Sequence, residues 1–283
     1  MINKITIIGV GLIGGSLAKA IKENNLAKVV FGFGRDLNRL EKAQKANIID
    51  QFSTNLKEAV DGSDVVVIAS PVGSFKKILS EIKPLIKGKM IVTDVGSTKK
   101  NIATMANLIL ESNSKHFVPA HPIAGKEKSG FEASDSKLFV NKKVIITPLE
   151  SSEPESIKLI QAMWQGIGAD VDFMSPDSHD ELLGMTSHLP HMLAFSLVNY
   201  LISKNPRASI YAGGGFKDST RIASGDAVMW RDICLQNKNQ IIDHIKGYQK
   251  ILNSLADTIE KEDSERLESL FNSAKESRDS WLG

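Results

Sequence analysis

The chain has 283 residues, 42% of them hydrophobic and 24% charged, which is the balance of a globular protein with one large or two modest domains. Lys and Arg number 35 against 33 Asp and Glu, so no broad basic field favours nucleic acid as a partner. The single cysteine, Cys234, excludes an internal disulfide and a thiolate zinc site, and it favours a cytoplasmic location. No apolar run reaches the roughly 18 residues of a membrane span, and Met1 leads directly into a strand-like pattern, so we expect neither membrane insertion nor a leader peptide.

Residues 1–174 alternate short β-branched runs with helix-length amphipathic stretches, the pattern of parallel strands joined by crossover helices. This pattern predicts an α/β fold with a doubly wound parallel sheet. A helix is expected over 153–167, because Ser152 can cap its start and Ile157, Ile160 and Trp164 recur at helical spacing. Strands are expected at 4–10, 29–33, 65–69, 90–95, 116–121, 144–147 and 170–174.

The second part of the chain, residues 175–283, has a different character. After Pro176 the β-branched runs end, and Leu, Met, Ala and Ile recur at spacings of three and four, so this part is predicted to be helical. It contains one glycine-rich polar loop, residues 212–226, and a connection of that length often carries function. From Asp257 onward the composition predicts a solvated amphipathic helix.

The segment GVGLIGGS, which starts at Gly9, ends the first expected strand and opens the first expected helix. In this context Gly9 allows a tight turn, Gly11 lets the backbone approach a pyrophosphate, and Gly14 permits close packing of helix on strand. The helix N-terminus, with Leu12 and Ile13 in its first turn, offers free N–H donors to phosphate. We therefore predict a dinucleotide site, with a glycine turn that binds nothing as the alternative.

The end of the second strand bears on the choice between NAD and NADP. The acidic residue that usually binds the ribose hydroxyls is expected at Gly34, and the neighbouring Arg35 can stack on adenine or pair with a 2′-phosphate. This favours NADP. Asp36 reaching back to the ribose, with Arg35 solvated, is the alternative and keeps NAD open. Ser70 and Pro71, after the third expected strand, complete the candidate cofactor contacts.

Four further segments concentrate polar residues. TDVGSTK (93–99) and HPIAGKEKSG (121–130) fall at strand ends, where open α/β sheets bind ligands. SHLPH (187–191) and FKDSTRIASGDAVMWRD (216–232) gather His, Arg, Asp and Trp in an otherwise aliphatic part of the chain. With GVGLIGGS, these segments resemble, in order and separation, the prephenate/arogenate dehydrogenase family of tyrosine biosynthesis, over nearly the whole chain.

The resemblance implies a Rossmann-like domain followed by an all-α dimerisation domain, and hence a homodimer. It implies oxidation of prephenate by NAD or NADP, with loss of carbon dioxide, to give 4-hydroxyphenylpyruvate. Arogenate as substrate, giving tyrosine directly, is the alternative. A chain of 283 residues is expected to carry neither a fused chorismate mutase nor a regulatory domain.

His121 is the candidate catalytic base. Hydride leaves the ring carbon that bears the hydroxyl, so a base at that oxygen lowers the barrier, and a histidine can accept this proton. The resemblance places the family's catalytic histidine at His121, and at Ser97 a residue that hydrogen-bonds both this histidine and the substrate. Loss of carbon dioxide rearomatises the ring, so no metal is expected.

The substrate's two carboxylates need cationic partners, and Arg221 is the best candidate, because a guanidinium can hold a carboxylate with two parallel N–H bonds. The resemblance gives this residue to the ring carboxylate. It also implies substrate contacts or a polar gate at Lys126, Glu127, His188, His191, Asp218 and Trp230.

Less specific interpretations stay open. His188 and His191 could only cap a helix, Trp230 could be core, Asp218 could only hold Arg221, and His121 could be structural. No motif surrounds the other histidines, His116, His179 and His244, and they are interpreted as ordinary surface or core residues. Two other function classes compete: a dehydrogenase of hydroxy acids or phosphosugars, and a dinucleotide sensor without catalysis.

Overall fold

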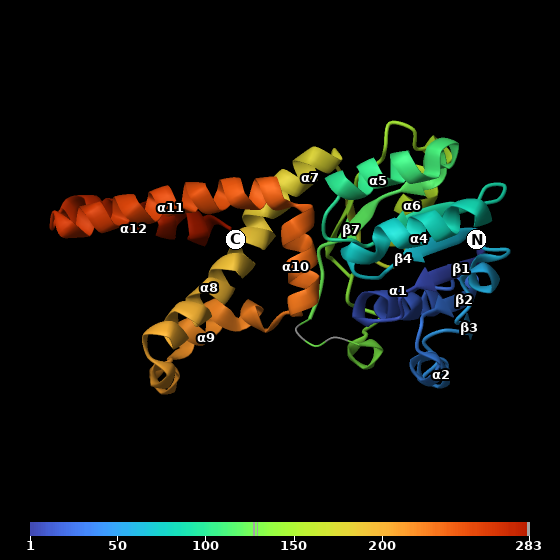
Figure 1. Cartoon of the computed structure of the whole chain (residues 1–283), viewed down its shortest axis with the longest axis horizontal. Helices are drawn as coiled ribbons and strands as arrows, with labels where there is room; N and C mark the ends of the chain where they lie inside the picture. The colour runs from blue at the N-terminus through green and yellow to red at the C-terminus, as the bar shows by residue number, and fades with distance from the viewer. Residues whose placement is uncertain (127, 129, 282–283) are drawn as a thin grey trace. The chain divides into compact units, whose positions relative to one another are not determined.

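The computed structural model describes residues 1–126, 128 and 130–281. The chain forms two compact units, Met1–Lys238 and Asn239–Gly283, and Figure 1 labels most of their elements along the chain. In the described ranges no helix is both long and apolar enough to cross a bilayer.

A six-stranded parallel sheet organises the first unit. Its strand order is β3-β2-β1-β4-β5-β6, so the order reverses between β1 and β4. Open sheets of this type bind ligands at the carboxyl edge beside such a reversal, because the connecting chains diverge there and leave a crevice. The predicted doubly wound sheet is confirmed, and the short strand β3 is additional. The strands are β1 (Ile2–Ile8), β2 (Ala27–Phe33), β3 (Gln51–Ser53), β4 (Val65–Ile68), β5 (Ile91–Asp94) and β6 (Phe117–Val118).

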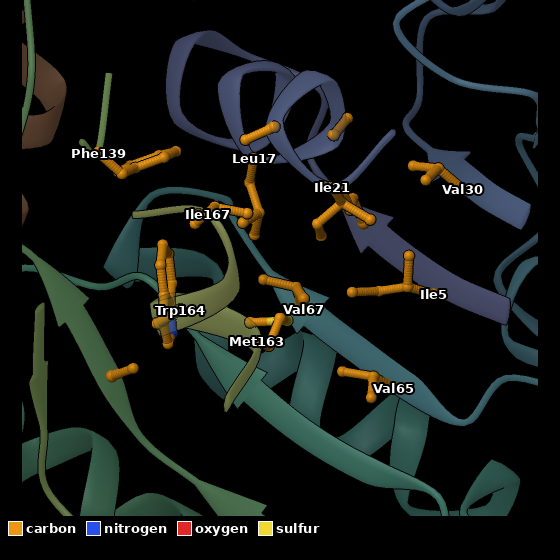
Figure 2. Close-up of a cluster of buried hydrophobic side chains, with 14 of the residues drawn as sticks. Ile5, Leu17, Ile21, Val30, Val65, Val67, Phe139, Met163, Trp164 and Ile167 are labelled. Carbon is orange, nitrogen blue, oxygen red and sulfur yellow. The ribbon is translucent and has the colours of Figure 1, made fainter. Parts of the chain in front are cut away.

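Helices cover both faces of this sheet because alternate strand residues point to opposite sides. Ile5 and Val67 face one core, where Figure 2 shows Leu17 and Ile21 of α1 and Trp164 of α6. Residues of the other parity on the same strands face a second core with α3, α4 and α5. These helices are α1 (Leu12–Glu23), α2 (Leu37–Lys45), α3 (Leu56–Val60), α4 (Phe75–Ile82), α5 (Lys100–Leu110) and α6 (Pro154–Gly166).

A second, three-stranded sheet follows, in the order β7-β8-β9, with β7 (Ala120–Pro122) antiparallel to β8 (Lys143–Ile146) and β9 (Asp170–Phe173) parallel to β8. The expected strand 116–121 is therefore wrong as one element: it divides around Pro119 into β6 and β7, which belong to different sheets. Proline donates no N–H to a sheet, which suits a position where pairing ends. The division places His121 in β7.

The expected cap of α6 is also wrong. The N-cap residue is Glu153, and Pro154 starts the helix. The Ser152 hydroxyl instead donates to the Phe117 carbonyl oxygen (2.7 Å) and accepts the Leu149 N–H (3.0 Å). Ser152 thus ties the chain before α6 to strand β6.

Helices dominate after residue 175, as predicted. The expected glycine-rich loop is largely helical, because α9 (Gly214–Thr220) and a 3-10 turn (Arg221–Ser224) occupy it. The expected single helix at the C-terminus is two helices, and the Asp263 side chain starts the second by accepting the Arg266 N–H (3.1 Å). The remaining bounds are α7 (Pro176–Leu183), a π-helical turn (Gly184–His188), α8 (Leu189–Lys204), α10 (Ala227–Gln236), α11 (Lys238–Glu260) and α12 (Ser264–Ser280).

Candidate active site

The glycine turn between β1 and α1 shapes a pocket of about 620 Å³. Gly9 has φ +100°, and a Cβ added there would lie 2.6 Å from the Ala69 carbonyl oxygen. A Cβ at Gly14 would lie 2.2 Å from the Gly9 carbonyl oxygen, so the helix packs closely on the turn. An added Cβ at Gly11 would meet nothing within 4 Å. Open space at Gly11 beside a tightly packed turn is what a bound pyrophosphate requires.

The first turn of α1 offers the donors for that group. Gly11 is the N-cap residue and supplies no side-chain cap, so the helix presents backbone N–H groups and the positive end of its dipole. The residues present therefore fit a dinucleotide. Leu12, Ile13 and Gly14 belong to this turn but are not among the described residues in the pocket wall. The predicted residues that do line the pocket are Gly9, Gly11, Gly34, Arg35, Ser70 and Pro71.

The residues after β2 bear on the alternative in which Asp36 binds the ribose of NAD. The Asp36 carboxylate accepts the Arg39 N–H (3.1 Å) and caps α2, so it is engaged locally. Arg35 and Arg39 are both exposed, and both line the pocket. Arg39 was not among the residues predicted from the sequence, although its place one helical turn after Arg35 was a usable signal.

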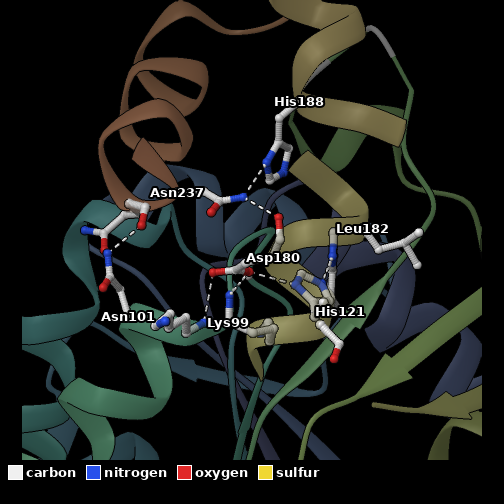
Figure 3. Close-up of polar contacts among 12 residues, drawn as sticks. Lys99, Asn101, His121, Asp180, Leu182, His188 and Asn237 are labelled. Atoms are coloured by element: carbon white, nitrogen blue, oxygen red, sulfur yellow. Dashed lines mark hydrogen bonds and ion pairs between the residues drawn. The ribbon is translucent and has the colours of Figure 1, made fainter. Parts of the chain in front are cut away.

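His121 lies at the centre of a buried polar network. Its Nδ1 is 2.8 Å from Nε2 of His179, and Nδ1 of His179 is 2.8 Å from Oδ1 of Asp180. His179 and Asp180 come from α7, and Figure 3 shows His121 and Asp180 close together within the network. His121 is 9% exposed, and His179 is fully buried. From the sequence, His179 was interpreted as an ordinary surface or core residue; the structure corrects this, because His179 contacts the candidate base.

The hydrogen-bond directions along this chain follow from chemistry. A carboxylate only accepts, so Nδ1–H of His179 donates to Asp180 and its neutral Nε2 accepts. Nδ1–H of His121 therefore donates to His179. This tautomer leaves the lone pair of His121 on Nε2, the ring nitrogen left for a substrate.

Asp180 is held at the N-terminus of α5. Its Oδ1 accepts the Lys99 N–H (2.7 Å), and its Oδ2 accepts the Lys100 N–H (3.0 Å). The buried Lys99 ammonium pairs with Asp94 and donates to the carbonyl oxygen of Ala120 (2.7 Å). The end of β5, the start of α5, β7 and α7 thus meet around two buried carboxylates and one lysine, as Figure 3 shows for Lys99 and Asp180.

The electrostatics keep His121 unprotonated at neutral pH. Burial lowers its pKa well below the usual value near 6.5, and repulsion by His179 and His188 in their protonated forms and by the Lys99 ammonium lowers it further. A neutral imidazole with its lone pair on Nε2 is the form that a general base needs.

His188 closes the network above Asp180. Asn237 donates Nδ2–H to the Asp180 carbonyl oxygen (2.7 Å), and the same amide nitrogen lies 3.1 Å from Nδ1 of His188. Burial lowers the pKa of His188 to about 4, while Asp180 and the Ser97 backbone oppose that shift. As N-cap of α8, His188 makes no side-chain cap bond, so the capping interpretation is wrong for it.

His191, Trp230 and Arg221 form a second group. The His191 and Trp230 rings stack with centroids 3.8 Å apart, and Nδ1–H of His191 donates to the Ser187 carbonyl oxygen (2.8 Å). Trp230 is 7% exposed, so it is both buried and in contact with a candidate substrate residue. Burial lowers the pKa of His191, and the Arg221 charge lowers it further, so the guanidinium acts on this ring.

Four predicted site residues do not make the predicted contacts in the part of the chain that the structure describes. In the described residues no hydrogen bond joins the Ser97 hydroxyl to His121, whose Nδ1 contacts His179; the Ser97 backbone acts on His188. Lys126 pairs with Asp135 (2.9 Å) and lines another pocket, beside Lys19 and Lys22. Asp218 is exposed on α9, one turn before Arg221, and Glu127 lies outside the described residues.

Four further members of the network were not predicted from the sequence: Asp94, Lys99, Asp180 and Asn237. Asp94 and Lys99 stand inside the quoted TDVGSTK segment, and two opposite charges five positions apart at a strand end were a signal for a buried pair. The adjacent His and Asp at 179–180, in the first helix after the strands, was a second signal. Over the described ranges no group of three His, Cys, Asp or Glu side chains could hold a metal ion.

Comparison with known proteins agrees with this geometry. The family model "Prephenate dehydrogenase, nucleotide-binding domain" matches residues 17–173, and "Prephenate dehydrogenase, dimerization domain" matches residues 175–273. Prephenate dehydrogenase of Bacillus subtilis (strain 168) is 36% identical over 99% of this chain and 76% of that protein. Cyclohexadienyl dehydrogenase of Zymomonas mobilis is 30% identical over 97% of this chain and 94% of that protein.

A solved structure is equally similar. The crystal structure of prephenate dehydrogenase from A. aeolicus, in complex with hydroxyphenyl propionate and NAD+, is 38% identical, covers 98% of each chain and superposes with a TM-score of 0.93. The family models together span most of the chain, on both sides of residue 174. The chain belongs to the prephenate dehydrogenase family of NAD(P)-dependent oxidoreductases.

Proposed function

We propose that this protein oxidises prephenate to 4-hydroxyphenylpyruvate with loss of carbon dioxide, using a nicotinamide dinucleotide. The observation that carries the proposal is the state of His121: a buried, neutral imidazole whose Nδ1–H is engaged by His179 and whose Nε2 lone pair is left for a substrate hydroxyl. The family to which the chain belongs supports the same reaction.

In this mechanism His121 takes the proton from the hydroxyl of the substrate ring. The carbon that bears this hydroxyl becomes carbonyl-like as hydride leaves it, so removal of the proton lowers the barrier, typically by about 10²- to 10⁴-fold in rate. The bound nicotinamide supplies the hydride acceptor. Release of carbon dioxide then restores the aromatic ring and makes the step irreversible.

Arg221 and His191 are the proposed carboxylate partners. The Arg221 guanidinium acts on the His191 ring, and Trp230 holds that ring by stacking. A substrate carboxylate between the two would accept N–H bonds from the guanidinium. Its negative charge would also favour a proton on His191, whose Nε2–H could then donate to it. Ser97, His188, Lys126, Glu127 and Asp218 remain proposed contacts or gate residues.

We propose a preference for NADP. Two arginines line the pocket beyond β2, Gly34 stands where a ribose-binding carboxylate is expected, and the Asp36 carboxylate caps α2. A 2′-phosphate would accept N–H bonds from Arg35 and Arg39. NAD has a neutral 2′-hydroxyl at that place, which would not attract the two guanidinium groups in this way.

Other parts of the proposal rest on sequence and family. Residues 1–174 are proposed to bind the dinucleotide, and 175–283 to complete the substrate site and form a homodimer. Arogenate is the second candidate substrate, because the cyclohexadienyl dehydrogenase of Zymomonas mobilis aligns over nearly the whole chain. A cytoplasmic location is proposed from the cysteine content, since Cys234 can form no internal disulfide.

One assay tests the function. Purified protein is mixed with prephenate or arogenate, each with NAD or NADP, and absorbance of the reduced nicotinamide is followed. We expect the fastest turnover with prephenate and NADP. Faster turnover with arogenate would change the substrate assignment, and no turnover in any of the four mixtures would refute the proposed function.

A further inference from the structure

The inner nitrogen of His121 contacts a second histidine rather than a carboxylate. The two links, from His121 to His179 and from His179 to Asp180, are both 2.8 Å long. These are hydrogen-bond lengths, so one continuous path joins the nitrogen opposite the reacting face of His121 to a carboxylate. Because Asp180 only accepts, both protons on the path point away from the substrate and toward Asp180.

The charges along the path differ at its two ends. The charged groups that act on His121 are His179, Lys99 and His188, and each disfavours a proton on His121. His179 is also near Lys99, but it faces two carboxylates, those of Asp180 and Asp94. A proton added to this pair is therefore held better on His179 than on His121.

We propose that His179 and Asp180 are positioning residues of this reaction: they fix His121 with its Nε2 lone pair toward the substrate, and His179 takes up the Nδ1 proton as His121 accepts the substrate proton. This rests on the proposed function. The substrate O–H bond breaks and an N–H bond forms at Nε2 of His121, while the Nδ1–H bond of His121 breaks and one forms at Nε2 of His179. The resulting imidazolium is His179, paired with Asp180.

The position of Asp180 suits this task. Backbone N–H groups of Lys99 and Lys100 fix both its oxygens at the start of α5, so the carboxylate cannot turn away from His179. Asn237 fixes the Asp180 main chain from α10. Burial lowers the pKa of both histidines, but for His179 the hydrogen bond to Asp180 opposes that effect, while every charge near His121 adds to it.

The first test is kinetic and uses His179→Gln. The Gln carbonyl oxygen can still accept Nδ1–H of His121 but cannot take the proton, so orientation is kept and transfer is lost. We expect kcat to fall about tenfold or more, with KM for prephenate within about twofold. The acid limb of the kcat profile should move to lower pH, because the proton must then stay on His121. His116→Gln, which changes a buried histidine that lies beside Glu153, should leave both unchanged.

Two kinetic outcomes would overturn the proposal. If His179→Gln keeps the wild-type kcat and pH profile, His179 only packs against His121. If the acid limb moves to higher pH at an unchanged plateau, His179 only repels a proton on His121. Urea unfolding of both variants shows whether a loss of kcat comes from a loss of folding.

The second test needs no turnover, so it stays decisive if the proposed function fails. In wild-type protein labelled with ¹⁵N-histidine, ring nitrogen shifts report tautomer and protonation for each histidine, with single variants for assignment. We expect His121 as the Nδ1–H tautomer and, on acidification, protonation of His179 before His121. His121 carrying its proton on Nε2, or protonating first, would overturn the proposal.

Discussion

At the scale of single residues, the site depends on buried polar groups that sequence periodicity does not distinguish. His121, His179 and His188 are all at most 9% exposed, and burial lowers the pKa of each. Burying a neutral histidine costs stability only when the unfolded chain can bind a proton that the folded chain cannot. The stability of this protein should therefore depend on pH in the acid range.

His188 gives the most specific prediction, because its pKa is lowered from 6.5 to about 4. Above pH 6.5 both states are neutral at this ring and nothing is lost. As pH falls toward 4, the unfolded state gains a proton that the folded state excludes, so the free energy of unfolding falls. At pH 5 this costs about 2 kcal/mol. Urea unfolding measures the free energy of unfolding at pH 7 and at pH 5. The decrease between the two pH values should be smaller in His188→Asn than in the wild type by about that amount.

The matched control for this measurement is His116→Asn, which removes a buried histidine outside the network. Its difference between pH 7 and pH 5 should not shrink by the amount seen for His188→Asn. An unchanged pH dependence in His188→Asn would contradict the lowered pKa of His188.

Arg35 and Arg39 give a second prediction at this scale. Each charge-assisted bond to a 2′-phosphate contributes about 1.5–3 kcal/mol, so Arg35→Ala or Arg39→Ala should raise the Kd for NADP about 10- to 100-fold. The Kd for NAD should change little. Titration of protein fluorescence with each dinucleotide measures both. Lys42→Ala removes the same charge from exposed surface on α2 and serves as the control. If the variants weaken the binding of NAD and NADP equally, the alternative holds, in which Asp36 binds the ribose.

The sequence predicted the residues of this site that stand in compact segments, and it missed those that depend on folding. His121, Arg221 and the glycine turn could be named because each belongs to a local motif at a strand end or in an unusual loop. His179 and Asp180 could not, because their role exists only where α7 meets the start of α5, and the sequence positions are far apart. Ser97 was assigned a hydrogen bond to His121, but the contact that the structure gives to Nδ1 of His121 comes from His179.

At the scale of elements, the turn from β1 into α1 separates a folding role from a binding role. Gly14 lies against the Gly9 carbonyl oxygen, a backbone atom that cannot move aside cheaply, whereas Gly11 faces open space. Both glycines belong to one motif, in which Gly11 is assigned to the approach of a pyrophosphate and Gly14 to the packing of helix on strand. The structure predicts opposite consequences for adding one methyl group to each.

Gly14→Ala should lower the free energy of unfolding by about 1–3 kcal/mol, because its Cβ overlaps backbone. Gly11→Ala should change that free energy by less than about 1 kcal/mol, because an extended φ of −105° suits alanine. It should nevertheless weaken the dinucleotide about tenfold or more, since the methyl group fills the space for the pyrophosphate. Urea unfolding and dinucleotide titration of both variants test this, and normal binding by Gly11→Ala would remove the pyrophosphate from this turn.

Strand and helix types were predictable where the apolar period was long, and boundaries failed where one residue decided them. Pro119 divides a continuous β-branched run between two sheets, and no periodicity reveals which sheet a strand joins. The glycine-rich segment 212–226 forms α9 and a 3-10 turn despite its glycines, because three of its four glycines stand together where α9 begins and the fourth, Gly225, comes after the 3-10 turn.

At the scale of the whole molecule, the helices after residue 175 leave large apolar side chains in water. On α8, Leu197 and Tyr200 are 40% and 61% exposed, and they share a face because they are three residues apart. Ile210 and Tyr211, in the turn after α8, are more exposed still. Monomeric proteins rarely expose such a concentration, and the segment lies within the match to a dimerization domain.

We therefore expect light scattering to give a mass near twice 30.9 kDa, with this face of α8 in the interface. Changing Leu197 and Tyr200 together to Asp would place two buried charges opposite the partner, each without a counter-ion, and should shift the protein to monomer at micromolar concentration. The control is Leu108→Asp, which puts one such charge on an exposed leucine of α5, outside the matched dimerization segment, and should leave the mass unchanged. A monomeric wild type would refute the homodimer. A dimer that persists in the double variant would place the interface on another surface, and in that case the exposed side chains of α8 would need a different partner to cover them.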